Sequence, residues 1–152
     1  MKILNVTAQK PNSTGSGIFL SELMKEFANK GHTQALVAGV YPEEETPVPD
    51  RVTFYPVYFE SEQLPYPITG MSDEMPYPST RYRDMTPKME AAFKESFLKQ
   101  LDEAVRDLNP DLILCHHLYL LTAIVREHFP DRKVFGFCHN TDLRQMQKTD
   151  LE

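Results

Sequence analysis

The sequence predicts an α/β domain in which a mainly parallel sheet lies between two layers of helices, a Rossmann-like three-layer arrangement. Short apolar runs alternate along the chain with segments whose apolar residues recur every three or four positions. The first group, residues 2–40, has the pattern of a strand, a glycine-bearing loop, a helix and a second strand. Such a unit forms two parallel strands joined by a right-handed crossover.

Composition limits the classes to which the protein can belong. At 152 residues, 41% hydrophobic and 25% charged, the chain has the makeup of one domain with a single core. A net charge of −6 argues against a nucleic-acid binder. The sequence has neither an apolar run of about 18 residues nor a leader-like start. We therefore expect a cytoplasmic protein without a transmembrane segment, and peripheral attachment to the inner membrane face stays open.

The first half of the chain supplies the expected crossover unit. We expect a strand at residues 2–8, a helix at residues 18–30 and a strand at residues 33–40. Gly31 is placed to end the helix in a left-handed conformation. A further strand is expected at residues 52–59, where Pro56 removes a hydrogen-bond donor and favours an edge position or a split strand.

Residues 60–86 form an insertion rich in proline, tyrosine and methionine. It holds too many prolines for regular structure and too many aromatic residues for a disordered linker. We expect a long loop beside the carboxyl edge of the sheet. It is either an acceptor-binding or lid segment, or an irregular surface insertion.

Regular patterns return in the second half. A cap at Thr86 and a helix-starting Pro87 precede an amphipathic helix that runs to Leu108. Three elements follow it: a strand at residues 112–115, a helix at residues 118–129 that is apolar on nearly all sides, and a strand at residues 134–138. We expect this helix to be buried and the last strand to be buried on both faces.

Polar residues follow the last strand at once, in the order His139, Asn140, Thr141 and Asp142. Open parallel sheets bind their ligands outside the carboxyl ends of the strands, so these residues are site candidates. The alternative is that Thr141 or Asp142 caps a helix and that His139 is a loop residue.

Gly15, Ser16 and Gly17 lie between the first strand and the first helix. Backbone N–H groups and the helix dipole favour an anion such as a phosphate at this position. The third glycine of a dinucleotide fingerprint and the lysine of a P-loop are both absent. The alternative is a flexible turn in which Ser13 or Thr14 helps to cap the helix.

Two strands end in sulfur and imidazole groups, as Cys115-His116-His117 and Cys138-His139. Zinc binds such groups, which makes a metal-dependent hydrolase one hypothesis. Because side chains alternate along a strand, Cys115 and His117 should face one way and His116 the other. We therefore expect no bound metal, and we expect both cysteines to be reduced residues of the core.

Two segments carry a resemblance to a known family, NPDLILCHHLYLLTAIVREHFPDRKVFGFCHNTDLRQM at residues 109–146 and TGSGIFLSELMKEFANKGH at residues 14–32. They resemble the N-terminal domain of GT-B glycosyltransferases of the retaining group often called family 4, or group 1. The resemblance implies a full-length enzyme in which two Rossmann-like domains face each other across a cleft. The second domain would hold most of the nucleotide-sugar donor, and the first would hold the acceptor.

The resemblance also implies roles for individual residues. It makes His139 the catalytic residue beside the donor sugar. It places three groups around the ligands: Gly15, Ser16 and Gly17 at the donor diphosphate, Asn140 and Thr141 next to them, and His116, His117 and Asp142 on the acceptor side. The chain departs from the family in having Ser16 between two glycines and Asn140 after the strand-end histidine.

The sequence is therefore interpreted as the acceptor half of a glycosyltransferase, inactive without its donor-binding domain. Its co-substrate would be a nucleotide-diphosphate sugar, with no other cofactor and no metal, and its acceptor an unknown saccharide or lipid-linked molecule. The main alternative is a stand-alone flavodoxin-like binding or regulatory domain. A stop codon after residue 152 would favour that alternative.

Overall fold

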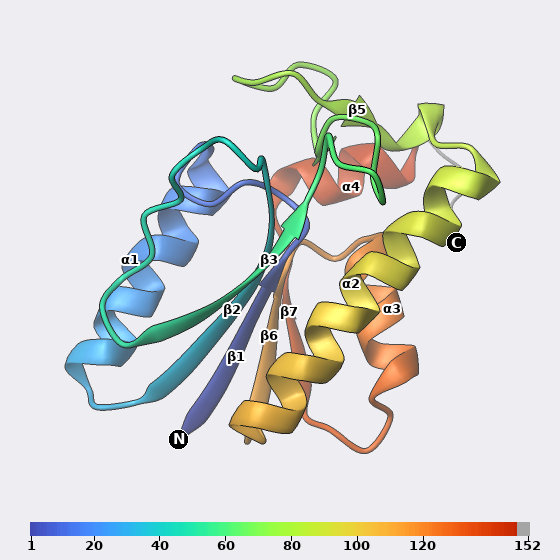
Figure 1. Cartoon of the computed structure of the whole chain (residues 1–152). Coiled ribbons are helices and arrows are strands. Elements are labelled where there is room, and N and C mark those ends of the chain that lie inside the picture. The colour runs from blue at the N-terminus through green and yellow to red at the C-terminus, as the bar shows by residue number, and fades with distance from the viewer. Residues whose placement is uncertain (149–152) are drawn as a thin grey trace.

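Five parallel strands form the central sheet, in the order β3-β2-β1-β6-β7. The computed structural model describes residues 1–148. The strands are β1 (Lys2–Thr7), β2 (Thr33–Val40), β3 (Val52–Tyr58), β6 (Leu112–His116) and β7 (Val134–Phe137). Helices lie on both faces of the sheet (Figure 1), so the predicted Rossmann-like α/β fold is confirmed.

The α-helices of the described part of the chain are α1 (Gly15–Asn29), α2 (Pro87–Leu108), α3 (Leu120–His128) and α4 (Asn140–Met146). Helix α1 covers one face, α2 and α3 cover the other, and α4 lies near the carboxyl ends of the strands (Figure 1). Because side chains alternate along a strand, β2 contributes to both cores. Its Val37 packs in the larger core with α2 and α3, and its Leu36 packs against Leu20 and Met24 of α1.

Helix ends follow local chemistry. The Thr14 hydroxyl accepts a hydrogen bond from the Gly17 backbone at 3.2 Å, so α1 begins at Gly15. The prediction that residues 15–17 form a loop before a helix starting at Ile18 was wrong, because this cap extends the helix by nearly one turn. Helix α2 begins after Thr86 as predicted, and Gly31 has the predicted left-handed backbone with φ +77°.

The insertion at residues 60–86 is irregular but anchored. It contains the short strands β4 (Thr69–Gly70) and β5 (Thr80–Arg81) and one 3-10 turn, Tyr82–Asp84. Leu64 and Ile68 are buried in the main core. Gln145 of α4 donates a hydrogen bond to the Met71 carbonyl at 3.2 Å. The insertion therefore lies beside α4, at the carboxyl edge of the sheet (Figure 1).

Three predictions about burial were wrong. Strand β7 pairs only with β6 among residues 1–148, and its Phe135 is 61% exposed, because β7 lies at the edge of the sheet. Cys138 follows this edge strand and is exposed, whereas Cys115 on β6 is buried. Helix α3 is amphipathic: Leu121, Ile124 and Val125 are buried, and its other side faces solvent. By contrast, β3 is an edge strand, as Pro56 predicted.

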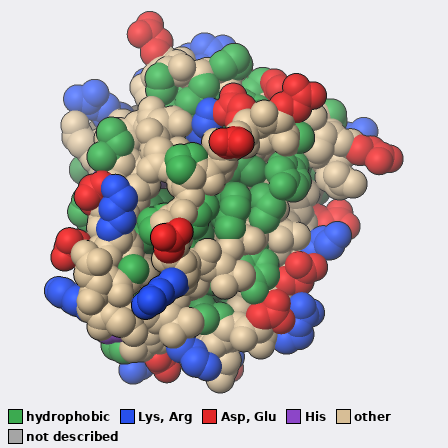
Figure 2. Space-filling view, turned by 60° about the vertical axis from the view of Figure 1, so that its left-hand side comes forward, with side chains coloured by type: hydrophobic (Ala, Val, Ile, Leu, Met, Phe, Trp, Pro, Cys, Tyr) green, Lys and Arg blue, Asp and Glu red, His purple; other side chains and the backbone are tan. Residues whose placement is uncertain are grey.

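One face of the molecule carries charges of both signs (Figure 2). Lys, Arg, Asp and Glu side chains are interspersed around the face seen in Figure 2, and hydrophobic side chains gather near its centre. This mixture gives that face no continuous positive patch for a polyanion. Among residues 1–148, no helix is both long enough and apolar enough to cross a membrane.

Candidate functional site

A pocket of about 340 Å³ opens at the carboxyl ends of β1 and β6. After β1 the chain adds strands on one side of the sheet (β2, β3), and after β6 it adds β7 on the other side. The pocket therefore lies at the topological switch point, where such folds bind ligands. Its walls come from the start of α1, the start of α4 and residues 71–76 of the insertion. The predicted site residues that line it are Gly15, Ser16, His117, His139, Asn140 and Thr141.

Three predicted site residues do not line this pocket. Gly17 is buried in the first turn of α1, where an added Cβ would lie 2.9 Å from the Asn12 backbone nitrogen. This close approach explains the glycine. His116 is 4% exposed and Asp142 is fully buried, and neither side chain reaches the wall of the pocket.

His117 has an unusual backbone, with φ +77° directly after β6. Few residues other than glycine adopt this left-handed conformation, and such conformations are concentrated at functional sites. The His117 backbone nitrogen donates a hydrogen bond to the Phe137 carbonyl at 3.1 Å, which ties the bend to β7. The bend thus fixes the imidazole at the pocket, where it is 6% exposed.

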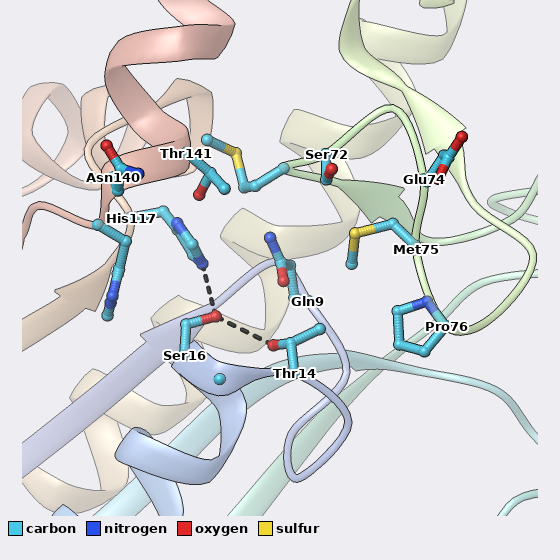
Figure 3. A pocket seen from close by; sticks show the side chains of 13 residues that line it. Gln9, Thr14, Ser16, Ser72, Glu74, Met75, Pro76, His117, Asn140 and Thr141 are labelled. Carbon is cyan, nitrogen blue, oxygen red and sulfur yellow. Dashed lines mark hydrogen bonds between the residues drawn. The ribbon is translucent and has the colours of Figure 1, made fainter.

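A chain of hydrogen bonds crosses the pocket floor through His117. Its Nδ1 lies 2.6 Å from Asp142 Oδ1, and its Nε2 lies 2.9 Å from Ser16 Oγ. Ser16 Oγ in turn lies 3.0 Å from Thr14 Oγ1, and Figure 3 shows the last two contacts as dashed lines. These hydrogen bonds join the start of α1, the residue after β6 and the first turn of α4.

Asp142 accepts three hydrogen bonds, although its side chain is fully buried. Besides His117, it accepts from the backbone N–H groups of Leu118 at 2.8 Å and His139 at 2.9 Å. Burial alone would raise the pKa of Asp142, but these bonds favour the carboxylate and hold the pKa below its ordinary value. Asp142 therefore supplies a fixed negative charge behind His117.

The other two histidines near the pocket are kept neutral. Burial, reinforced by repulsion from His139 and His117, lowers the pKa of His116 to about 3. The His116 ring stacks on Phe137, with centroids 5.0 Å apart. Burial and the neighbouring His117 also lower the pKa of His139, outweighing the attraction of Asp142. His139 Nε2 has no hydrogen-bond partner among the described residues.

Gln9 is a site residue that the sequence reasoning missed. It is 3% exposed, lines the pocket, and its Nε2 makes no hydrogen bond within residues 1–148. Figure 3 shows its side chain between His117 and Met75, directed into the pocket. A buried amide without a partner is costly, so this group is ready to donate to a ligand. Its position just after β1 was the available signal, since it is the strand-end logic that singled out His139.

The start of α1 adds a positive field. Gly15 and Ser16 head the helix at the pocket, and its first turn holds no acidic residue. This end of a helix favours a negative group through its N–H donors and dipole. Glu74 is the one carboxylate among the described lining residues, and it lies on the opposite wall, away from Ser16 (Figure 3).

The cysteines and histidines at the strand ends do not assemble a metal centre. In residues 1–148, no group of three or more His, Cys, Asp or Glu side chains is placed to hold a metal ion. Burial raises the pKa of Cys115 to about 12, which keeps it a thiol. Cys138 is exposed at the end of the edge strand.

Comparison with known proteins identifies no family for this chain. The chain matches no protein-family model and no curated protein sequence. It is similar to a solved structure of a UDP-galactose 4-epimerase with a TM-score of 0.39 and 14% identity. The match covers 77% of this chain and 38% of the epimerase chain. A likeness at this level carries no argument about activity, so function is argued below from the pocket.

Proposed function

We propose that the chain is the acceptor-side domain of a retaining glycosyltransferase that uses a nucleotide-diphosphate sugar. The observation that carries the proposal is the switch-point pocket headed by the N-terminus of α1. Its N–H groups at Gly15 and Ser16 suit a diphosphate, and the polar side chains of Asn140 and Thr141 lie on the facing wall. The family resemblance of residues 14–32 and 109–146 supports the same assignment.

Within this proposal, the pocket residues have distinct tasks. The helix end stabilises the negative charge that develops on the leaving diphosphate. Burial keeps His139 neutral, and its Nε2 has no partner within residues 1–148, so this pocket residue can hydrogen-bond a sugar hydroxyl. His116 and Asp142 are buried and act through the residues that they position, not by direct contact with an acceptor.

A single domain supplies only one wall of a transferase cleft. Transfer requires that donor and acceptor be held together away from water, so we propose that the chain is inactive without a second, donor-binding domain. A few backbone hydrogen bonds at about 0.5 to 1.5 kcal/mol each barely exceed the cost of immobilising a nucleotide. Affinity of this chain for a nucleotide sugar should therefore be weaker than roughly millimolar. We propose a cytoplasmic location, with peripheral membrane association if the acceptor is lipid-linked.

Titration with UDP-, GDP- and ADP-sugars, followed by amide NMR spectra, tests the proposal. We expect one of the three to shift the amides of Gly15, Ser16, Asn140 and Thr141 at millimolar concentration. Gly15→Asp places a negative charge at the helix end, in a position with no atom within 4 Å of the new Cβ. Because acidic residues are favoured there, the fold should persist while the shifts disappear.

Ala91→Asp is the matched control, because it makes the same charge change at an exposed position on α2. It should leave the nucleotide shifts intact. If no nucleotide sugar shifts the pocket amides, or if Gly15→Asp and Ala91→Asp bind alike, the proposal is wrong.

A stand-alone binding domain is the second candidate, because all the residues that line the pocket of about 340 Å³ belong to this one domain. That volume lies in the range of small-molecule sites, which is about 300–1,000 Å³. Micromolar binding of a nucleotide or nucleotide sugar by this chain alone would favour the binding domain over the transferase half.

A further inference from the structure

Ser16, His117 and Asp142 have the geometry of a serine nucleophile with its base and the carboxylate that orients that base. Ser16 Oγ lies 2.9 Å from His117 Nε2, and His117 Nδ1 lies 2.6 Å from Asp142 Oδ1. Both contacts fall within the reach required of an activated nucleophile. Such a set is recognised by geometry and roles, whatever the fold and the chain order.

The directions of these hydrogen bonds follow from chemistry. The Asp142 carboxylate can only accept, so neutral His117 carries its proton on Nδ1 and leaves Nε2 as an acceptor. Ser16 then donates its proton to Nε2. The Thr14 hydroxyl oxygen already accepts from the Gly17 backbone at 3.2 Å, so its own proton is available to Ser16 Oγ. Ser16 is thereby aligned to lose its proton to His117.

The pocket also holds a donor for the oxyanion that such a nucleophile would create. Gln9 Nε2 is buried, unpartnered among residues 1–148 and directed into the same space (Figure 3). A side-chain amide at this position can stabilise a tetrahedral intermediate. Met71, Met75 and Pro76 line the opposite wall, which suits a short apolar acyl group.

We propose that this pocket hydrolyses short-chain carboxylic esters, with Ser16 as nucleophile, His117 as base, Asp142 as the positioning carboxylate and Gln9 as oxyanion donor. This inference does not rest on the transferase proposal and requires neither a nucleotide nor a second domain. It rests on Gln9, Ser16 and His117, which line one pocket, and on Asp142, which is buried behind His117.

The reaction proceeds in two balanced steps. Ser16 Oγ bonds to the ester carbonyl carbon, its proton moves to His117 Nε2, and the carbonyl electron pair moves to the oxygen facing Gln9. The carbon–oxygen bond to the alcohol then breaks, and the leaving alkoxide takes the proton from His117. Water attacks the acyl-Ser16 carbonyl, gives one proton to His117 and releases the carboxylic acid as Ser16 recovers its proton. The sum is ester plus water giving acid plus alcohol.

Labelling with a serine-directed fluorophosphonate, located by mass spectrometry, tests the nucleophile. We expect one label per chain, on Ser16, and none on Ser16→Ala. Ser13→Ala is the matched control, since Ser13 lies three residues before Ser16 in the loop that leads into α1, and its hydroxyl donates to the Pro11 carbonyl at 3.3 Å. It should label at the wild-type rate.

Hydrolysis of p-nitrophenyl butyrate tests the base and the oxyanion donor. His117→Asn should slow both labelling and hydrolysis by about 10²-fold or more, and asparagine tolerates the left-handed backbone at this position. Gln9→Met should slow hydrolysis by about 10²-fold. Far-UV circular dichroism confirms that each variant is folded, and Ser16→Ala, an exchange in the first turn of a helix, remains informative if His117→Asn is not. Absence of label on Ser16 in folded protein, or equal hydrolysis by wild type and Ser16→Ala, would overturn the proposal.

Discussion

Replacing Asp142 by asparagine should lower the free energy of unfolding by about a third or more of the value of an ordinary domain. The carboxylate accepts from His117 and from the backbones of Leu118 and His139, at 2.6, 2.8 and 2.9 Å. Bonds to a charged group contribute about 1.5–3 kcal/mol each, and asparagine turns one acceptor oxygen into a donor facing donors. Because such losses are not additive, we expect the free energy of unfolding to fall by roughly 3–5 kcal/mol.

Urea unfolding at pH 7, followed by circular dichroism, measures this loss. The matched control is Asp111→Asn, because exposed Asp111 accepts a single backbone bond, from Lys2 at 2.8 Å, and should lose less than about 1 kcal/mol. A thermal scan should show a fall in Tm of roughly 10 °C for Asp142→Asn, at about 2–4 °C per kcal/mol for a chain of this length. If Asp142→Asn loses no more than Asp111→Asn, the three-bond account of this carboxylate is wrong.

Acid unfolding gives the same carboxylate a second test. Because folding lowers the pKa of Asp142, its contribution is complete above the ordinary value of 3.8 and is lost as the pH falls through the lower folded-state value. Wild type should lose stability in that window, and Asp142→Asn should lack this part of the loss.

Three further predictions concern a buried histidine, two glycines of the sheet and the N-cap of α2. Burial in the folded state lowers the pKa of His116 from 6.5 to about 3, so the unfolded state binds more protons between those values and stability should decline from pH 6.5 towards 3. The urea midpoint of His116→Phe should decline less over the same pH range. An equal decline in wild type and His116→Phe would contradict this. Gly39→Ala should cost roughly 2–4 kcal/mol in urea unfolding, because its Cβ would lie 2.3 Å from the backbone oxygen of Ala8. At Gly136 the close contact of a new Cβ is with the movable end of the Leu118 side chain, so Gly136→Ala should cost less than about 1 kcal/mol, and equal losses would refute the distinction. Thr86→Ala removes the 3.3 Å cap bond of α2 and should cost about 0.5–2 kcal/mol, while Thr86→Ser should restore most of it.

Apolar periodicity predicted the sheet and its three longer helices, and the rule that parallel sheets bind ligands at the ends of their strands predicted where a pocket should lie. Each of these predictions depends on local patterns in the sequence. What the sequence could not reveal depends on neighbours distant in the chain. The open edge at Phe135 follows from strand order, which periodicity does not encode. Likewise, the alternative in which Thr141 or Asp142 is the N-cap of a helix was wrong, because His139 is the N-cap of α4 and both residues lie in its first turn. The bond from Asp142 to His117 depends on the adjacency of β6 and β7. Nor does any local pattern mark Gln9 beyond its place after β1, because only the folded environment shows that its Nε2 lacks a partner within residues 1–148.

The hydrogen-bond chain through His117 also has consequences for when the site forms during folding and how often it opens. Ser16 and His117 are 101 residues apart in sequence, and His117 and Asp142 are 25 apart. Contacts of such long range form late in folding, after the sheet has brought the loops together. Asp142 lies on α4, a helix of only 7 residues. A brief local opening of α4 would therefore release the His117 imidazole without unfolding the sheet. The backbone amides of α4 should therefore exchange with solvent hydrogen faster than the amides of the strands that support the site.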